Sequence, residues 1–111
     1  MLISMICIFP VSAFAQSPAG PIVKASYYQT GKTTANGEHF NPNGMTAAHK
    51  TLPFGTRLLV TNVATGKSVV VRVNDRGPFI RGRVLDLARG AAIAIGMIAS
   101  GTANIRIAHV N

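Results

Sequence analysis

Carboxylate chemistry in this 111-residue chain must use one of only three acidic side chains, Glu38, Asp75 and Asp86. Asp75 ends an apolar segment and enters the turn Asp75–Pro78, a position from which an acid could face a groove. Glu38 lies on the turn Ala35–Glu38, and Asp86 precedes an alanine-rich stretch. Each acid also has a structural alternative. Asp75 could bond the backbone of its turn, Glu38 could be solvated, and Asp86 could cap a helix.

Basic side chains supply the other chemical groups. His49, flanked by small residues in Thr46–His49, could orient a carboxylate or a sugar hydroxyl, or it could be structural. Several arginines lie close to the Asp75 turn in sequence, and they could clamp lactyl or phosphate groups or form a solvated basic face. They are Arg72, Arg76, Arg81, Arg83 and Arg89.

The composition narrows the classes of protein and site. With 11 Lys+Arg against 3 Asp+Glu the net charge is +8, but 48% hydrophobic residues exclude a disordered polycation. The single cysteine excludes an intrachain disulfide framework and a multi-thiolate zinc site. His49 and the three acids match no metal-binding spacing, so we expect no metal and no cofactor. No nucleic-acid motif is present, so we expect the positive charge to meet anionic envelope polymers and not nucleic acid.

The N-terminal stretch predicts export. Residues 1–15 are apolar, carry no charged side chain and end in Ala13-Phe14-Ala15, which fits a signal peptide cleaved before Gln16. The alternative is a buried N-terminal strand or helix. The stretch is too short for a membrane-spanning helix, so we expect no membrane span and a location in the periplasm or cell envelope. Residues 16–22 are predicted to be a linker, and residues 23–111 a single domain.

Short β elements dominate the rest of the chain. Alternation and β-forming residues predict strands over 23–28, 83–85 and 103–110, and a hairpin of 56–62 with 68–74. The polar stretch 29–43 is predicted to be a long surface loop. A helix is expected from about Leu87 to Ile95, capped by Asp86 and stopped by Gly96. This pattern favours a mainly β fold, a small closed β-barrel.

Several motifs in this order resemble the septal ring lytic transglycosylases of the rare lipoprotein A (RlpA-like) family. The resemblance covers about Val23 to Val110. It implies a six-stranded double-psi β-barrel with one or two short helices. It also implies an enzyme that cleaves peptidoglycan glycan strands at the MurNAc–GlcNAc bond, preferring strands without stem peptides, and leaves 1,6-anhydro-MurNAc ends. The motifs are Ala25–Tyr28, Thr34–Glu38, Thr46–His49, Leu52–Thr56, Val73–Phe79, Arg81–Arg83 with Asp86-Leu87, and Gly96-Met97.

The resemblance also implies site residues. The family's Asn-Asp-Arg-Gly-Pro-Phe, Thr-Ala-Ala-His and Gly-Glu motifs place its functional residues on Asp75, His49 and Glu38. The related expansins, which share the barrel, have an essential Asp at the position of Asp86. We therefore expect these four residues to be catalytic. Substrate contacts are expected from Tyr28, Asn36, Arg76 and Arg81, and the protein is expected to be a monomer.

The acid and base roles stay open at this level. Closing an anhydro ring needs an acid for the glycosidic oxygen and a base for the C6 hydroxyl, and one carboxyl group could serve both in turn. Such an acid needs a raised pKa, whereas arginines near Asp75 would lower it. Either the groove desolvates Asp75, or another acid donates the proton. The alternative function is a non-catalytic, expansin-like module that binds or loosens cell-wall polysaccharide.

Overall fold

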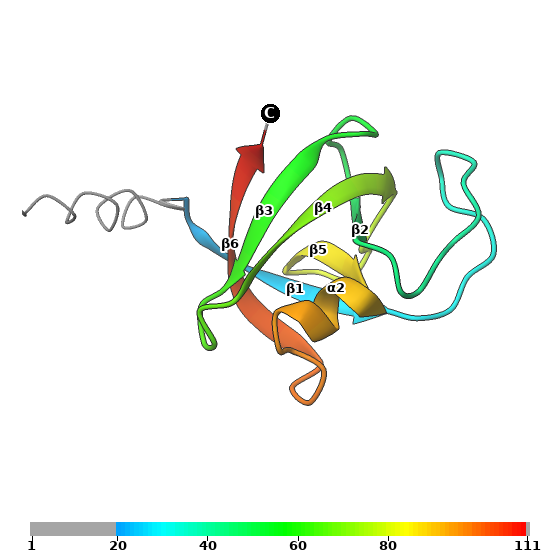
Figure 1. Cartoon of the computed structure of the whole chain (residues 1–111). Helices are drawn as coiled ribbons and strands as arrows, with labels where there is room; N and C mark the ends of the chain where they lie inside the picture. The colour runs from blue at the N-terminus through cyan, green and yellow to red at the C-terminus, as the bar shows by residue number, and fades with distance from the viewer. Residues whose placement is uncertain (1–19, 111) are drawn as a thin grey trace, which may run out of the picture.

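Residues 20–110 are described by the computed structural model, and their six strands close into a barrel (Figure 1). The predicted mainly β fold, a six-stranded double-psi barrel with a short helix, is confirmed. The signal peptide predicted at 1–15 lies outside the described residues, and so does residue 111. The elements are β1 (Ile22–Tyr28), β2 (Thr46–His49), β3 (Arg57–Asn62), β4 (Ser68–Asp75), β5 (Arg83–Ala88), α2 (Arg89–Ala94) and β6 (Thr102–Val110).

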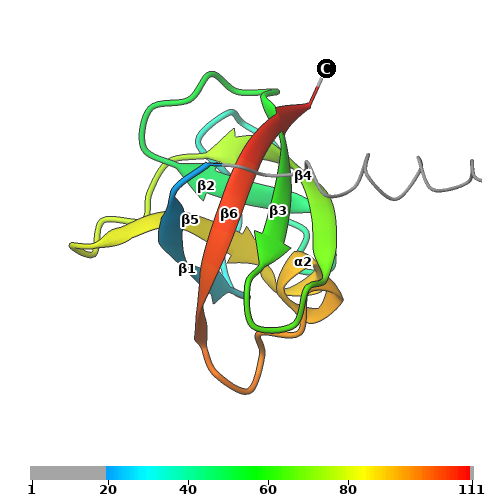
Figure 2. The same cartoon turned by 90° about the vertical axis from the view of Figure 1, so that its left-hand side faces the viewer.

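The strand order around the barrel is β1-β5-β2-β4-β3-β6, with β6 returning to β1. Pairs β1–β5 and β2–β4 are parallel, and the other pairs are antiparallel. Figure 2 shows β6 crossing the face of the barrel beside β1 and β3. Closure leaves no long unpaired strand edge, so the backbone groups of the strands are satisfied without a partner chain.

The core fills the barrel through period-two alternation. On β3 and β4, Leu58, Val60, Val71 and Val73 are at most 1% exposed, and they confirm the inward face of the predicted hairpin. Helix α2 covers one end of the barrel, where its Ala91 packs in the same core. Burying each valine or leucine side chain of β3 and β4 contributes about 1.5–3 kcal/mol to stability.

The prediction that Asp86 caps a helix starting at Leu87 is wrong. Asp86 and Leu87 lie within β5, which is paired on both sides, and α2 begins only at Arg89. The N-cap residue is Ala88, and no side chain caps the helix. The physical reason is that strand pairing extends the backbone through Ala88, so the Asp86 carboxyl projects from a sheet and not toward free helical N–H groups.

Strand β2 is an element that the β-forming pattern does not reveal. Its sequence Thr-Ala-Ala-His is short and has weak β propensity. It forms because β4 and β5 pair with it from both sides. The two alanines also keep the space on either side of this strand free of large side chains.

Gly90 fixes the start of α2 against the long loop. Its N–H donates to the Pro42 carbonyl oxygen at 2.7 Å. A Cβ atom at position 90 would lie 2.5 Å from the Asn43 carbonyl oxygen and 2.6 Å from the carbonyl carbon. This contact needs a glycine because the two backbones pass too closely for any side chain.

We therefore expect Gly90→Ala to destabilise the protein, although alanine is the better helix former. Helix propensity alone would raise stability by about 1 kcal/mol, whereas forcing the backbones apart costs about 3 kcal/mol, at the upper end of overpacking penalties. Urea unfolding of both forms measures the difference. Ala94→Gly, at an exposed site of the same helix, is the control and should cost no more than about 1 kcal/mol. A Gly90→Ala variant more stable than the natural chain would contradict the close approach.

Candidate active site

A row of side chains crosses four neighbouring strands on the outer face of the barrel. Ser26 pairs with Asp86 across β1 and β5, Asp86 pairs with Ala48 of β2, and Ala48 pairs with Asp75 of β4. Paired residues of neighbouring strands point to the same face of a sheet. Their inward neighbours Ala47 and Leu87 are fully buried in the core. The row therefore places two carboxyl groups on one face, with backbones roughly 10 Å apart across an intervening alanine.

An irregularity in strand pairing brings Asp75 into this row. Val73 faces the core, so strict alternation would turn Asp75 inward as well. The β2–β4 register shifts by one residue after Ala47–Val73, and Asn74 is left without a partner in β2. Such bulges re-aim a side chain, and here the shift turns Asp75 to the outer face.

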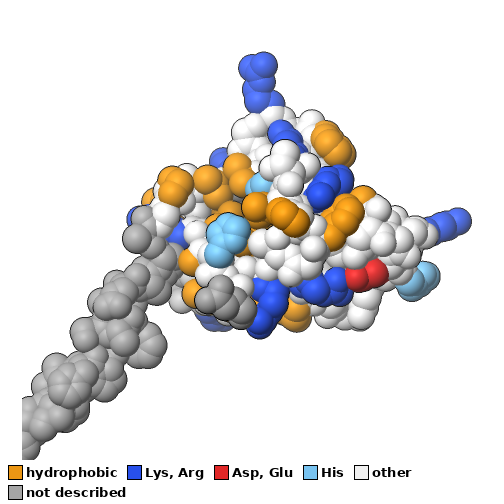
Figure 3. All heavy atoms as spheres, turned by 90° about the horizontal axis from the view of Figure 1, so that it is seen from above, with side chains coloured by type: hydrophobic (Ala, Val, Ile, Leu, Met, Phe, Trp, Pro, Cys, Tyr) orange, Lys and Arg blue, Asp and Glu red, His pale blue; other side chains and the backbone are white. Residues whose placement is uncertain are grey.

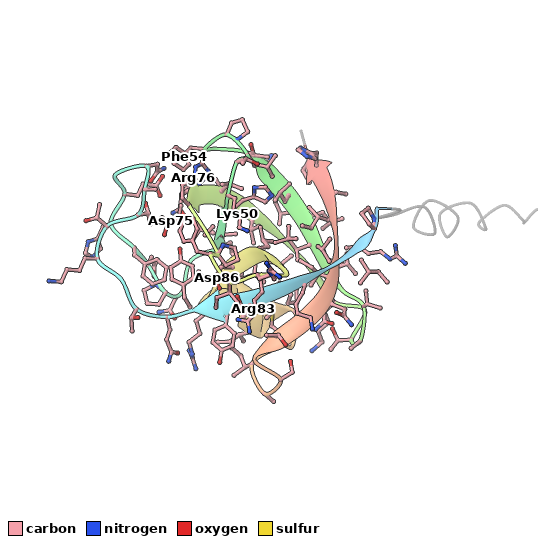
Figure 4. The ribbon with its side chains drawn as sticks, turned by 180° about the vertical axis from the view of Figure 1, so that it is seen from behind. Lys50, Phe54, Asp75, Arg76, Arg83 and Asp86 are labelled. Carbon is pink, nitrogen blue, oxygen red and sulfur yellow. The ribbon has the colours of Figure 1, made fainter. Side chains whose placement is uncertain are left out.

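The row lies in a hollow of about 300 Å³ that we call the first hollow. Both aspartates line it, and Figure 4 shows them on one face with Arg76 and Phe54 beyond Asp75 and Arg83 beyond Asp86. Strands β1, β2, β4 and β5 and the segment after β4 form its walls. The lining residues are Ser26, Tyr27, Tyr28, Ala48, Asp75, Arg76, Gly77, Pro78, Phe79, Ile80, Arg83 and Asp86.

Asp86 is the partly buried acid of the first hollow. Burial raises the pKa of its carboxyl group above the ordinary value, and the nearby charge of Asp75 raises it further. The hydrogen bond donated by Ser26 Oγ to Asp86 Oδ1, at 3.0 Å, and the charge of Arg83 act in the opposite direction. The net direction is upward, which is the property that a proton donor requires.

Asp75 is held by three hydrogen-bond donors. The N–H groups of Ala35 and Arg76 each donate to Oδ1 at 2.9 Å, and the Tyr28 hydroxyl donates to Oδ2 at 3.1 Å. Tyr28 in turn stacks on Phe40, with ring centroids 4.6 Å apart. Burial first, and then Asp75, raise the pKa of the Tyr28 phenol. The phenol is therefore a hydrogen-bond donor at neutral pH, and Asp75 is fixed in orientation from both the loop and β1.

Glu38 lies outside the first hollow, in a polar cluster that ties the long loop to β4. Arg72 donates to both of its carboxylate oxygens, and the side-chain amides of Asn36 and Asn74 donate as well. These hydrogen bonds, that of Arg72 above all, lower the pKa of Glu38 to about 2. Glu38 is therefore ionised and engaged, which fits a residue that positions the loop.

This cluster predicts a pH-dependent loss of stability. Because the folded-state pKa of Glu38 lies below its unfolded value of 4.5, Glu38 stabilises the fold above that pH, and the contribution is lost as pH falls toward 2. We expect the natural chain to have a higher Tm than Glu38→Gln at neutral pH, and the difference to close below pH 4.5. Calorimetry across this range measures it, and an NMR titration of the Glu38 carboxyl carbon gives the pKa directly. A Tm difference that does not change with pH would contradict the role.

His49 also lies outside the first hollow. Its Nδ1 accepts hydrogen bonds from the backbone N–H groups of Thr51 and Leu52, both at 3.1 Å. Burial lowers its pKa, and the positive charge of Arg76 lowers it further. A neutral imidazole that accepts at Nδ1 carries its proton on Nε2. The ring therefore organises the turn after β2.

Of the four residues expected to contact the substrate, two line the first hollow and two lie outside it. Tyr28 and Arg76 line the first hollow, whereas Asn36 and Arg81 do not. The Arg76 guanidinium donates to the carbonyl oxygens of His49 and Leu52 and lies 3.9 Å from the centre of the Phe54 ring. Asn36 accepts from Thr34 Oγ1 and from the Glu38 N–H, within the loop. Arg81 is exposed beside the hollow.

Ser26 and Phe79 line the first hollow, but the sequence analysis gives them no role although both lie within the quoted motifs. Ser26 is a hydroxyl on the same strand face as Tyr28, and this two-residue spacing is the signal that could have placed it beside the acids. Phe79 is 80% exposed and lines the hollow, so it offers an apolar face next to two carboxyl groups. The sequence does not show which aromatic side chains are exposed. Only the folded structure therefore reveals that Phe79 can offer an apolar face to a ligand.

Basic side chains outnumber acidic ones in the chain, with 11 Lys+Arg against 3 Asp+Glu. Figure 3, which shows the barrel from above, has cationic side chains spread between apolar ones and a small acidic area. Within residues 20–110 no group of three or more His, Cys, Asp or Glu side chains is placed to hold a metal ion. In the same residues no helix is long and apolar enough to cross a membrane.

Comparisons with known proteins show the family to which this chain belongs. A family model described as "Lytic transglycolase" matches residues 22–107. Over 77 residues the chain is 66% identical to a "Probable endolytic peptidoglycan transglycosylase RlpA" of Nostoc sp., covering 69% of this chain and 21% of that protein. It is 57% identical over 86 residues to the "Endolytic peptidoglycan transglycosylase RlpA" of Campylobacter jejuni, covering 75% and 31%. The crystal structure of apo expansin from Clavibacter michiganensis has the same fold, with a TM-score of 0.65 and 24% identity over 81% of this chain and 50% of that one.

The protein is a member of the lytic transglycolase family, because the family model covers most of the chain. The chain spans about a fifth to a third of the length of the curated relatives that it matches. The resemblance seen in the sequence motifs is thereby confirmed.

Proposed function

We propose that the protein is an endolytic peptidoglycan transglycosylase of the cell envelope that cleaves glycan strands at the MurNAc–GlcNAc bond. The observation that carries this proposal is the row Ser26–Asp86–Ala48–Asp75, which brings two carboxyl groups with different environments into one hollow. Relatives at 50–66% identity are named for this activity, which supports the assignment.

In the proposed reaction Asp86 is the acid and Asp75 is the base. The C6 hydroxyl oxygen of MurNAc attacks C1 of the same sugar, and the bond from C1 to the GlcNAc oxygen breaks. Asp86 gives its proton to the departing oxygen, and Asp75 takes the proton of the C6 hydroxyl. No water is consumed, and the product ends in a 1,6-anhydro ring. Proton exchange with solvent then restores both carboxyl groups.

The environments of the two acids support this division of roles. Asp86 is the group whose pKa burial raises, so it holds a proton closer to neutral pH than an ordinary aspartate does. Asp75 accepts hydrogen bonds from three donors, so its oxygens are aimed and its carboxylate is a fixed acceptor. Glu38 and His49 act through the loops they hold, as positioning residues. Tyr28, Asn36, Arg76 and Arg81 are proposed to serve substrate binding directly or through these loops.

Product analysis tests the proposed function. The purified protein is incubated with intact sacculi and with amidase-stripped glycan strands, and mass spectrometry detects the ends formed. We expect 1,6-anhydro-MurNAc ends, mostly from stripped strands, and a rate that falls as pH rises through the pKa of Asp86. Reducing ends that carry oxygen from labelled water would show hydrolysis and contradict the mechanism. Binding to sacculi without any product would instead support a non-catalytic, expansin-like module.

A further inference from the structure

A second hollow, of about 450 Å³, is lined by Lys24 of β1, two residues before Ser26 of the first hollow. Its walls are the segment after β3, the segment between α2 and β6, and the outer faces of β1 and β6. Lys24, Asn62, Thr65, Ser100, Thr102 and Asn104 supply its polar lining. No acidic side chain is among the residues that line it. It therefore differs from the first hollow, which holds both aspartates.

Strand pairing places residues of the two hollows next to each other. Thr102 of the second hollow pairs with Ser26 of the first across β6 and β1, so the row of outward residues runs on from Asp75 through Asp86 and Ser26 to Thr102. Both paired side chains, Ser26 and Thr102, are small. Lys24 pairs with Asn104 on one side and with Arg83, which lines the first hollow, on the other.

We infer that the second hollow binds a further sugar unit of the same glycan strand, distal to the bond that is cleaved. This inference rests on the proposed function. Its chemistry follows from the lining. Hydroxyl and amide side chains suit the hydroxyl and N-acetyl groups of a sugar, and the lining has no carboxylate that would repel the lactyl carboxylate of a MurNAc unit. The row of paired outward residues crosses five β-strands from Asp75 to Thr102, and we place the distal sugar unit along this row.

Some polar side chains that line the second hollow already donate hydrogen bonds within the protein, and the other polar side chains can contact a ligand. Asn62 and Thr65 both donate to the Ile95 carbonyl oxygen, and Ser100 donates to backbone oxygens of its own segment. These bonds fix the walls. The exposed Lys24 and Asn104 project from the strand faces between them, in the position to meet a sugar ring. The hollow is thus preformed, which lowers the ordering cost of binding.

Filling the second hollow tests the inference. Ala64 is exposed and lines it, so Ala64→Trp adds bulk there without disturbing the core. The readout is the ratio of kcat/KM for a stripped dodecasaccharide to that for a MurNAc–GlcNAc disaccharide, which is too short to reach the second hollow. We expect this ratio to fall about tenfold in Ala64→Trp and several-fold in Asn104→Ala, as when one or two hydrogen bonds are lost. Val70→Trp, on the outer face of β4 away from both hollows, is the control and should keep the natural ratio. An unchanged ratio in Ala64→Trp overturns the inference.

A binding measurement separates this inference from the proposed function. In an isotope-labelled Asp86→Asn protein, the dodecasaccharide should shift the amide signals of Thr102 and Asn104 as well as those of the first hollow. The disaccharide should shift only the signals of the first hollow. If signals shift at both hollows but the natural chain does not cleave glycan, the second hollow is still a sugar site and the proposed transglycosylase function is refuted. Shifts confined to the first hollow at both lengths, with cleavage intact, would overturn the second site alone.

Discussion

Replacing Asp86 by asparagine is expected to lower glycan cleavage by about 10²–10⁴-fold, the usual contribution of a general acid. Asparagine has nearly the same shape and keeps an oxygen to accept the Ser26 hydroxyl, but it has no proton to give to the departing sugar oxygen. The loss should therefore fall on kcat, with KM little changed. Rates of anhydro-end formation on stripped strands measure it.

The same variant should be more stable than the natural chain at neutral pH. Because the folded-state pKa of Asp86 is raised, ionising it destabilises the fold as pH rises from 3.8 through the folded value. Asparagine cannot ionise, so the variant escapes this loss. The gain in Tm should be present at pH 7 and should disappear below about pH 3.8, the unfolded value. A gain that persists at low pH would show that packing, and not ionisation, caused it.

Asp75→Asn is expected to cause the second large loss, about 10²–10³-fold in kcat, by removing the base. The fold should be retained because the asparagine oxygen still accepts the N–H groups of Ala35 and Arg76. Circular dichroism and thermal unfolding check the fold, and product analysis checks the rate. Full activity in this variant would refute the assignment of Asp75.

An activated leaving group distinguishes the two aspartates. A substrate whose departing group is a dinitrophenolate leaves without protonation, so it should restore most of the rate in Asp86→Asn. It should not restore Asp75→Asn, because the C6 hydroxyl must still lose its proton. Rescue of Asp75→Asn alone would reverse the two roles, and rescue of neither would place both residues in binding.

Local patterns are sufficient for much of the fold. The β3–β4 hairpin, the closing strand β6 and the Gly96 stop are predictable because alternation and turn residues act over a few neighbours. The resemblance of the motifs to a known family supplies the number of strands. Strand β2 and the true start of α2 are not visible in the local pattern, since both depend on pairing with strands distant in sequence.

By itself, the sequence determined which groups were available for catalysis. With only three acidic side chains in the chain, composition alone confines the choice to Glu38, Asp75 and Asp86. The tertiary structure decided where these three acids lie relative to one another. Pairing through Ala48 and the register shift at Asn74 bring Asp75 and Asp86 into one hollow, while Arg72 and two amides engage Glu38 outside it. Burial, which sets the direction of the Asp86 pKa, depends on how the strands pack, and no sequence spacing encodes it.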